Sequence, residues 1–206
     1  MKTGAENSDR RFWLHLPYLI LLCVVFMASC KSSGTSGGFD ILGPADETAE
    51  AAKIVAEANE DLTRIKVLYK ENEGKREDLK KAMEANDAEK AKKIADDVVY
   101  LINDGMAFGE SAVDKIQKAQ EMQINDDYRE YLRLKEDALK RQLEAFENYR
   151  QAARTLRTKY DPKNAAMREA VKEEFKTRNE NYRKMMEEAR DFSNRANELA
   201  KAALKK

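Results

Sequence analysis

The residue types that most often carry chemistry lie at the start of this chain of 206 residues. Its only cysteines are Cys23 and Cys30, and its only histidine is His15. The residues after Cys30 therefore offer no imidazole for proton transfer near neutral pH and no thiolate for a metal ion. We expect no catalytic residue, no metal ligand and no cofactor site in that part of the chain.

Carboxylates are abundant in the body of the chain, but their spacing does not indicate a reactive pair. Glu173–Glu174 and Glu187–Glu188 are typical of solvated helix faces. An enzyme or metal carrier of the ferritin-like kind, which also uses four long helices, requires Glu-x-x-His pairs. No nucleophile motif or phosphate-binding glycine loop stands out either, so the sequence argues against this class of function.

The first thirty residues have the organisation of an export signal. A basic region with Arg10 and Arg11 precedes an apolar stretch over residues 19–26, and small residues lead to Cys30. A membrane-spanning helix needs about 20 apolar residues, whereas this run is shorter and is interrupted upstream by Pro17. The segment therefore predicts a cleaved signal, with an uncleaved membrane anchor as the alternative.

The tetrad Met27-Ala28-Ser29-Cys30 resembles the lipobox of bacterial lipoproteins. In that family an aliphatic residue and two small residues precede an invariant cysteine, and Met27 departs from the more usual leucine. The resemblance implies cleavage between Ser29 and Cys30 and a diacylglycerol thioether on the Cys30 sulfur. It also implies a further acyl chain, such as palmitate, on the new amino terminus. Several acyl chains anchor stably where one is marginal, so the implied partner of Cys30 is a lipid membrane.

The residue after the cysteine bears on location. In lipoproteins of bacteria with two membranes, a residue other than aspartate at this position favours the outer membrane, and here it is Lys31. The resemblance thus implies a lipid-anchored cell-envelope protein, on the outer membrane and facing the periplasm if the source has two membranes. The alternative is an ordinary secretory signal followed by a soluble, secreted helical protein with a free thiol.

Composition changes again after the cysteine. Residues 31–44 are rich in serine and glycine, as is typical of a flexible linker. The residues that follow mix charged and apolar side chains. The sequence therefore predicts a signal peptide over 1–29, the lipidated cysteine and linker over 30–44, and a helical domain over 45–206.

Apolar residues in that domain recur at alternating spacings of three and four, the period of helices packed along their length. The charged fraction of 37% with only 8 Gly and 3 Pro also favours an all-α protein. We expect helices from near Asp46 to Met83, from Ala88 to near Met122, from Asp126 to Tyr160, and from Pro162 almost to the C-terminus.

Four such helices with short links predict a long antiparallel four-helix bundle that resembles a coiled coil. The alternative is two helical hairpins that pair only in a homodimer, because the apolar period does not distinguish partners within one chain from those in two. Met167 is expected on the inward stripe of the fourth helix.

Five residues interrupt the pattern. Gly105 and Gly109 fall within the second helix, where each costs about 1 kcal/mol relative to alanine, which indicates a close helix approach or a kink. The apolar stripe also carries three polar residues, Lys135, Gln142 and Arg178. This placement predicts either snorkelling side chains, whose polar ends reach solvent, or polar contacts that set the register of the helices.

The function best favoured is that of a non-enzymatic envelope protein, namely a spacer, adaptor or assembly factor with a protein partner. The 38 basic and 38 acidic residues balance and are interspersed, so nothing indicates nucleic acid. Eight tyrosines, several on the apolar stripes, leave open a protein that binds a hydrophobic or cell-wall ligand between its helices.

Overall fold

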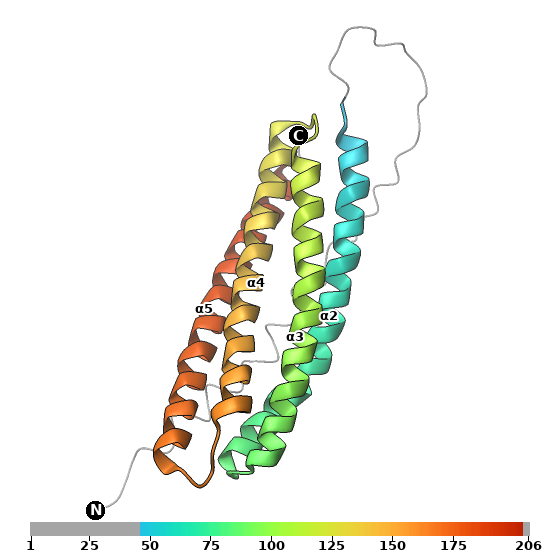
Figure 1. Ribbon diagram of the computed structural model, residues 1–206. Coiled ribbons are helices and arrows are strands. Elements are labelled where there is room, and N and C mark those ends of the chain that lie inside the picture. Colours follow the sequence, from blue (N-terminus) through green and yellow to red (C-terminus); the bar gives the residue numbers. More distant parts are fainter. Residues whose placement is uncertain (1–45, 204–206) are drawn as a thin grey trace, which may run out of the picture. The chain divides into compact units, whose positions relative to one another are not determined.

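The computed structural model describes residues 46–203, which form four α-helices and, within that range, no strand. These are α2 (Thr48–Glu84), α3 (Ala88–Gln120), α4 (Asp126–Lys159) and α5 (Ala165–Ala203) (Figure 1). The expected all-α four-helix bundle is confirmed. The expected signal peptide, Cys30 and the expected linker lie outside the described residues, and the four helices belong to one compact unit.

Short polar side chains begin the helices, as the sequence indicates for two of them. Asp87 Oδ1 accepts from the Lys90 amide at 3.1 Å, and Asn125 Oδ1 accepts from the Tyr128 amide at 2.8 Å. Each bond satisfies one of the amides that the first turn of a helix leaves unpaired. Asp46 accepts from the amide of Thr48 at 2.9 Å in the same way before α2.

The start of the last helix differs from the prediction. Pro162 does not occupy its first position, because α5 begins three residues later at Ala165. Asn164 takes the capping role instead, since its Oδ1 accepts from the Met167 amide at 3.1 Å. Met167 is 45% exposed rather than inward, and it lies in the first turn of α5, near Lys159 at the end of α4.

The link between α2 and α3 is a tight turn built on Asn86. Its φ of 55° is left-handed, and Asn is the residue other than glycine that adopts this conformation most readily. The amide of Asn86 donates to the Met83 carbonyl, and the amide of Asp87 donates to the Ala82 carbonyl. These two bonds satisfy the last carbonyls of α2 and reverse the chain into α3.

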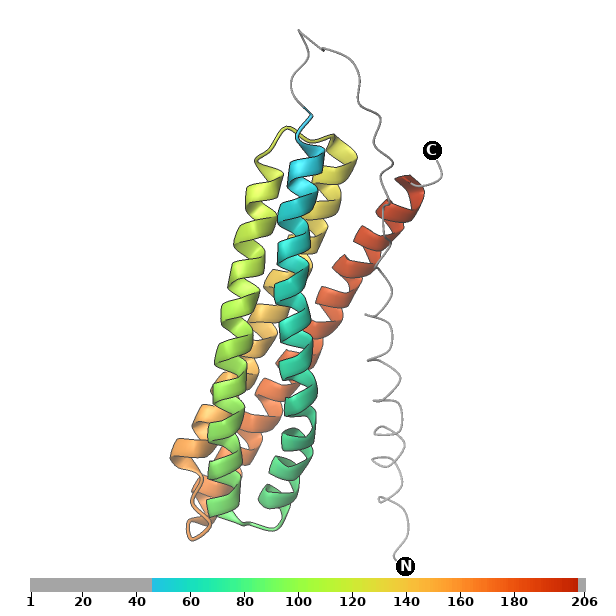
Figure 2. The same ribbon diagram turned by 90° about the vertical axis from the view of Figure 1, so that its right-hand side faces the viewer.

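Each helix packs against its neighbours in the sequence, α2 on α3, α3 on α4 and α4 on α5. The four helices thus pack within one chain. By contrast, no Cα of α2 lies within 8 Å of a Cα of α5. Figure 2 shows α5 diverging from α2 toward its C-terminal end. The side of the bundle between the first and last helices is therefore bridged by long side chains.

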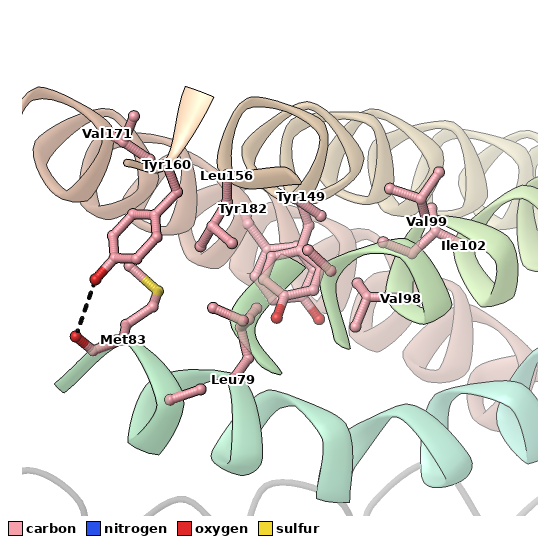
Figure 3. Close-up of a cluster of buried hydrophobic side chains, with 14 of the residues drawn as sticks. Leu79, Met83, Val98, Val99, Ile102, Tyr149, Leu156, Tyr160, Val171 and Tyr182 are labelled. Carbon is pink, nitrogen blue, oxygen red and sulfur yellow. Dashed lines mark hydrogen bonds between the residues drawn. The ribbon is translucent and has the colours of Figure 1, made fainter. Parts of the chain in front are cut away.

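The apolar interior divides into two clusters along the helices. The cluster nearest the α2–α3 link draws on all four helices, and Figure 3 shows it with Leu79 of α2, Val98 of α3, Tyr149 of α4 and Tyr182 of α5. The second cluster, nearest the α3–α4 link, is built from α2, α3, Ile124 of that link and α4, with no buried member from α5. The core therefore changes from four helices to three along its length.

Candidate functional site

Every reactive residue singled out in the sequence precedes the described range. Cys30, Cys23 and His15 all lie before residue 46, so no geometry accompanies the expected lipidation of Cys30. Within residues 46–203 no group of three histidine, cysteine or carboxylate side chains is placed to hold a metal ion. None of the four described helices has a stretch long and apolar enough to cross a bilayer.

The one concentration of polar groups inside the four-helix part of the core surrounds Arg76. The guanidinium carbon of Arg76 lies 5.0 Å from the ring centre of Tyr149 and 5.2 Å from that of Tyr182. These distances are those of cation–π contacts. The Arg76 Nη1 also donates to the Tyr69 hydroxyl at 3.4 Å, so three tyrosines from three helices enclose one cation.

Helical periodicity explains how the sequence brings these groups together. Tyr69, Asn72 and Arg76 follow one another at spacings of three and four, which places them on one face of α2. Tyr149 and Tyr182 occupy the inward stripes of α4 and α5, and both are buried. The Tyr182 hydroxyl donates to the Tyr69 hydroxyl at 3.5 Å and so joins α5 to α2 across the side where their backbones stay apart.

The electrostatics keep Arg76 charged and Tyr149 and Tyr182 neutral. Burial lowers the pKa of Arg76, but Tyr182, Tyr149 and Tyr69 raise it by more, so it lies above its ordinary value. Burial raises the pKa of Tyr149 and holds that of Tyr182 well above 10, although Arg76 opposes both shifts. At neutral pH the cluster therefore carries one uncompensated positive charge.

A cavity of about 30 Å³ adjoins this cluster. Its polar lining comes from Asn72, Arg76 and the three tyrosines, and the rest is apolar except for Gly105 of α3. Asn72 is 8% exposed, and its Oδ1 is buried without a hydrogen-bond donor. A cavity needs about 10–15 Å³ to hold a water molecule, so this one has room for a group of a few atoms.

Other buried polar groups in the bundle have their partners within it. Asp61 of α2 accepts from Ser111 at 2.8 Å and from Lys115 at 2.6 Å, both on α3. These bonds outweigh the opposing effect of burial and lower the pKa of Asp61. Such satisfied contacts fix the register of one helix against the next.

Glu136 of α4 forms the equivalent contact with the preceding helix. It accepts from Gln117 at 2.7 Å and from Gln120 at 2.6 Å, and Lys140 lies 2.6 Å away. These bonds again outweigh burial and lower the pKa of Glu136. The α3–α4 pair is thus held by a saturated polar contact.

Three of the five interruptions found in the sequence, Arg178, Lys135 and Gly109, have packing roles. Arg178 is paired with Glu174 at 2.9 Å and donates to Gln151 of α4 at 2.5 Å, as a register-setting contact would. Lys135 extends over the Tyr131 ring, 5.9 Å from its centre, and Gln142 is partly buried. A Cβ on Gly109 would collide with the Leu143 side chain, which confirms a close approach of α3 to α4 there.

No known protein family, curated protein or solved structure matches this chain. The Arg76 cluster therefore has to be interpreted from its own geometry. Sequence reasoning missed Asn72 and Arg76, although a signal was present. In the part of α2 that follows Asp61, the inward positions run 65, 69, 72, 76, 79 and 83, and in that part the apolar stripe is broken at 72 and 76.

Proposed function

We propose that this chain is an exported lipoprotein, anchored through acylated Cys30, whose helical domain serves as a non-catalytic spacer, adaptor or assembly factor in the cell envelope. The observation that carries the proposal is the tetrad Met27-Ala28-Ser29-Cys30, which directly follows an apolar leader. A linker rich in serine and glycine then separates Cys30 from the first helix. The proposed location is the cell envelope, and in a bacterium with two membranes it is the outer membrane with the domain facing the periplasm.

The geometry of the bundle is compatible with such a role. The amide of Glu47, just before α2, donates to the Gln123 carbonyl at 3.0 Å, so the chain enters the bundle beside the α3–α4 link. The α2–α3 and α4–α5 links lie at the other end (Figure 1). At 1.5 Å per residue, helices of 33 to 39 residues separate the two ends by about 50 Å. The domain therefore has two separate end surfaces, one where the chain enters and one about that far along the helices.

The anchor is tested by growing cells with a labelled fatty acid and measuring the mass of the mature protein. We expect label and added acyl mass in the wild type and in Cys23→Ala, and neither in Cys30→Ala. Cys23→Ala is the matched control because it removes the other cysteine of the leader. A wild-type protein without label, or label that survives in Cys30→Ala, would reject the proposal in favour of a secreted or signal-anchored protein.

Photo-crosslinkers at exposed positions distinguish an adaptor from a spacer. Val67, Tyr100 and Met167 are the large apolar side chains that stand exposed in the described range, and they report on three different helices. A discrete envelope product that forms with the anchored protein and is lost with Cys30→Ala supports an adaptor. A product of twice the chain's mass indicates a homodimer, and the absence of any product favours a spacer.

The cavity beside Arg76 favours a second candidate function, the binding of a ligand between the helices. Pockets for drug-sized molecules measure about 300–1,000 Å³, and this cavity measures about 30 Å³. Its volume thus restricts the occupant to a small polar group and does not suit a large hydrophobic molecule.

A further inference from the structure

We propose that the cavity bordered by Asn72 and Arg76 binds a carboxylate group. The proposal goes beyond the lipid anchor and does not depend on it. It rests on the charge, the unpaired polar atom and the size of the cavity.

The first argument concerns charge. The other interior charges have an opposite charge close by, as in Asp61 with Lys115 at 2.6 Å and Arg178 with Glu174 at 2.9 Å. Within residues 46–203 no carboxylate lies within 4.0 Å of the Arg76 nitrogens, although its side chain is largely buried. Neutral tyrosine rings stabilise the Arg76 cation only in part. A bound anion would supply the negative charge that the neighbouring side chains do not provide.

The second argument concerns hydrogen bonds. A guanidinium presents planar donors that match the two oxygens of a carboxylate, and the Tyr69 and Tyr182 hydroxyls can turn to donate as well. Asn72 Oδ1 has no donor, so the amide is free to turn over and present its NH2 group to an anion. A carboxylate would then receive bonds from Tyr69, Asn72 and Arg76 on one face of α2 and from the Tyr182 hydroxyl of α5.

The third argument concerns size and access. A volume of about 30 Å³ accommodates the three heavy atoms of a carboxylate but excludes an aromatic ring or an alkyl chain. The cavity is partly open to solvent, so the remainder of a larger molecule can stay outside. The ligand class is therefore formate, acetate or the terminal carboxylate of a longer molecule.

The proposal is tested on the full chain, purified in detergent, by calorimetric or NMR titration with formate, acetate and acetamide. Because very small ligands bind weakly, we expect saturable binding of formate and acetate with a Kd of about 1–10 mM. Acetamide has the shape of acetate without its charge, and we expect it to bind at least about tenfold more weakly. Equal affinity for acetamide, or no saturation with either acid, would reject a carboxylate site and leave a cavity that holds only water.

Three variants locate the binding. Asn72→Asp is nearly isosteric and places an internal carboxylate beside Arg76, so acetate affinity should fall about tenfold or more while the helical circular dichroism is retained. Arg76→Gln should abolish binding. Arg154→Gln, which removes an exposed arginine of α4, should bind as the wild type does. Unchanged affinity in a folded Asn72→Asp protein would show that the anion binds elsewhere and would refute the assignment.

A final comparison identifies the source of the carboxylate. The titration is repeated with an N-acetylated dipeptide that ends in a free carboxylate and with its C-terminal amide. Tighter binding of the acid than of acetate, lost in the amide, would support a peptide terminus as the natural ligand. Binding confined to formate and acetate would support a free small acid.

Discussion

The Tyr160 hydroxyl lies 3.3 Å from the main-chain carbonyl oxygen of Met83, so the residue that ends α4 is tied to the last turn of α2 (Figure 3). The same hydroxyl lies 3.2 Å from Asn86 Oδ1, and Tyr160 is fully buried. Since the backbones of α2 and α4 do not approach each other, this contact is a direct link across the bundle. It closes the end that carries the α2–α3 and α4–α5 links.

Removal of that hydroxyl should weaken the fold. Tyr160→Phe keeps the ring but removes the hydroxyl bonds to the Met83 carbonyl and to Asn86 Oδ1. The Met83 carbonyl still accepts from the Asn86 amide, so we expect a loss of about 1 kcal/mol in the free energy of unfolding. Urea denaturation followed by circular dichroism measures it. Tyr100→Phe, at a tyrosine that is 71% exposed, is the control and should have little effect. A loss in Tyr160→Phe below about 0.5 kcal/mol would contradict the role given to this contact.

The buried Asp61 should make stability depend on pH in the acid range. Its folded pKa lies below the ordinary 3.8, because the bonds from Lys115 and Ser111 outweigh burial. A lowered folded pKa means that the carboxylate stabilises the fold above pH 3.8 and that this contribution is lost as the pH falls through the folded pKa. Urea denaturation between neutral pH and pH of about 3 should show this loss, and Asp61→Asn should reduce its size.

At neutral pH the same variant should also be less stable. Asp61→Asn leaves Lys115, whose side chain is 30% exposed, without its carboxylate. Breaking a fully buried pair costs about 3–5 kcal/mol, and partial exposure of the lysine reduces the expected loss to about 2 kcal/mol. Asp104→Asn, at an exposed position of α3, is the control. Equal stability of Asp61→Asn and wild type would mean that the pair is not formed in solution.

Glycines within helices should respond to alanine according to their surroundings. A Cβ on Gly74 of α2 would meet nothing within 4 Å, so Gly74→Ala should stabilise the protein by about 1 kcal/mol through helix propensity. A Cβ on Gly109 would collide with Leu143, so Gly109→Ala should lose that gain or become destabilising. Thermal and urea denaturation of the two variants provide the comparison. Equal gains would show that α3 and α4 are less closely packed than described.

Ionisation of the interior tyrosines should be delayed in alkali. Burial raises the pKa of Tyr149 and Tyr182, so both phenols should remain protonated in the folded protein after they would ionise in the unfolded chain. A raised folded pKa means that this contribution to stability is complete below pH of about 10 and is lost as the pH rises through the folded value. Near-ultraviolet absorbance of the native and urea-unfolded chains measures the difference, and coincident titration curves would contradict it.

The fold could be predicted from the sequence because most local signals agree with the packing. Asp87 and Asn125 cap the helices that follow them, and Val98, Tyr149 and Tyr182 lie on the apolar stripes of their helices and are buried. Pro162 misled the prediction because proline suits both the first turn of a helix and the link before it. The hydrogen bond from the Met167 amide to Asn164 shows that Pro162 belongs to the link.

The candidate site was harder to predict because it depends on contacts between helices. Asn72 and Arg76 look like ordinary surface residues unless it is known, to within one residue, which positions of α2 face the interior. The sequence does not indicate that Tyr149 and Tyr182, 33 residues apart, close on the same guanidinium. The sequence also does not indicate that α5 diverges from α2. The inward stripe of α5 stays regular to Leu199, although only α4 packs against this helix.

The change from a four-helix to a three-helix core gives α5 two halves of unequal local stability. Its C-terminal half, with Ala189 and Ala196 buried, rests on α4 alone and adds no buried member to the second cluster. That half can detach without exposing the interior between α2, α3 and α4, so its amide hydrogens should exchange with solvent through local opening. The half that carries Tyr182 should exchange only through global unfolding, because its release would break the Arg76 cluster.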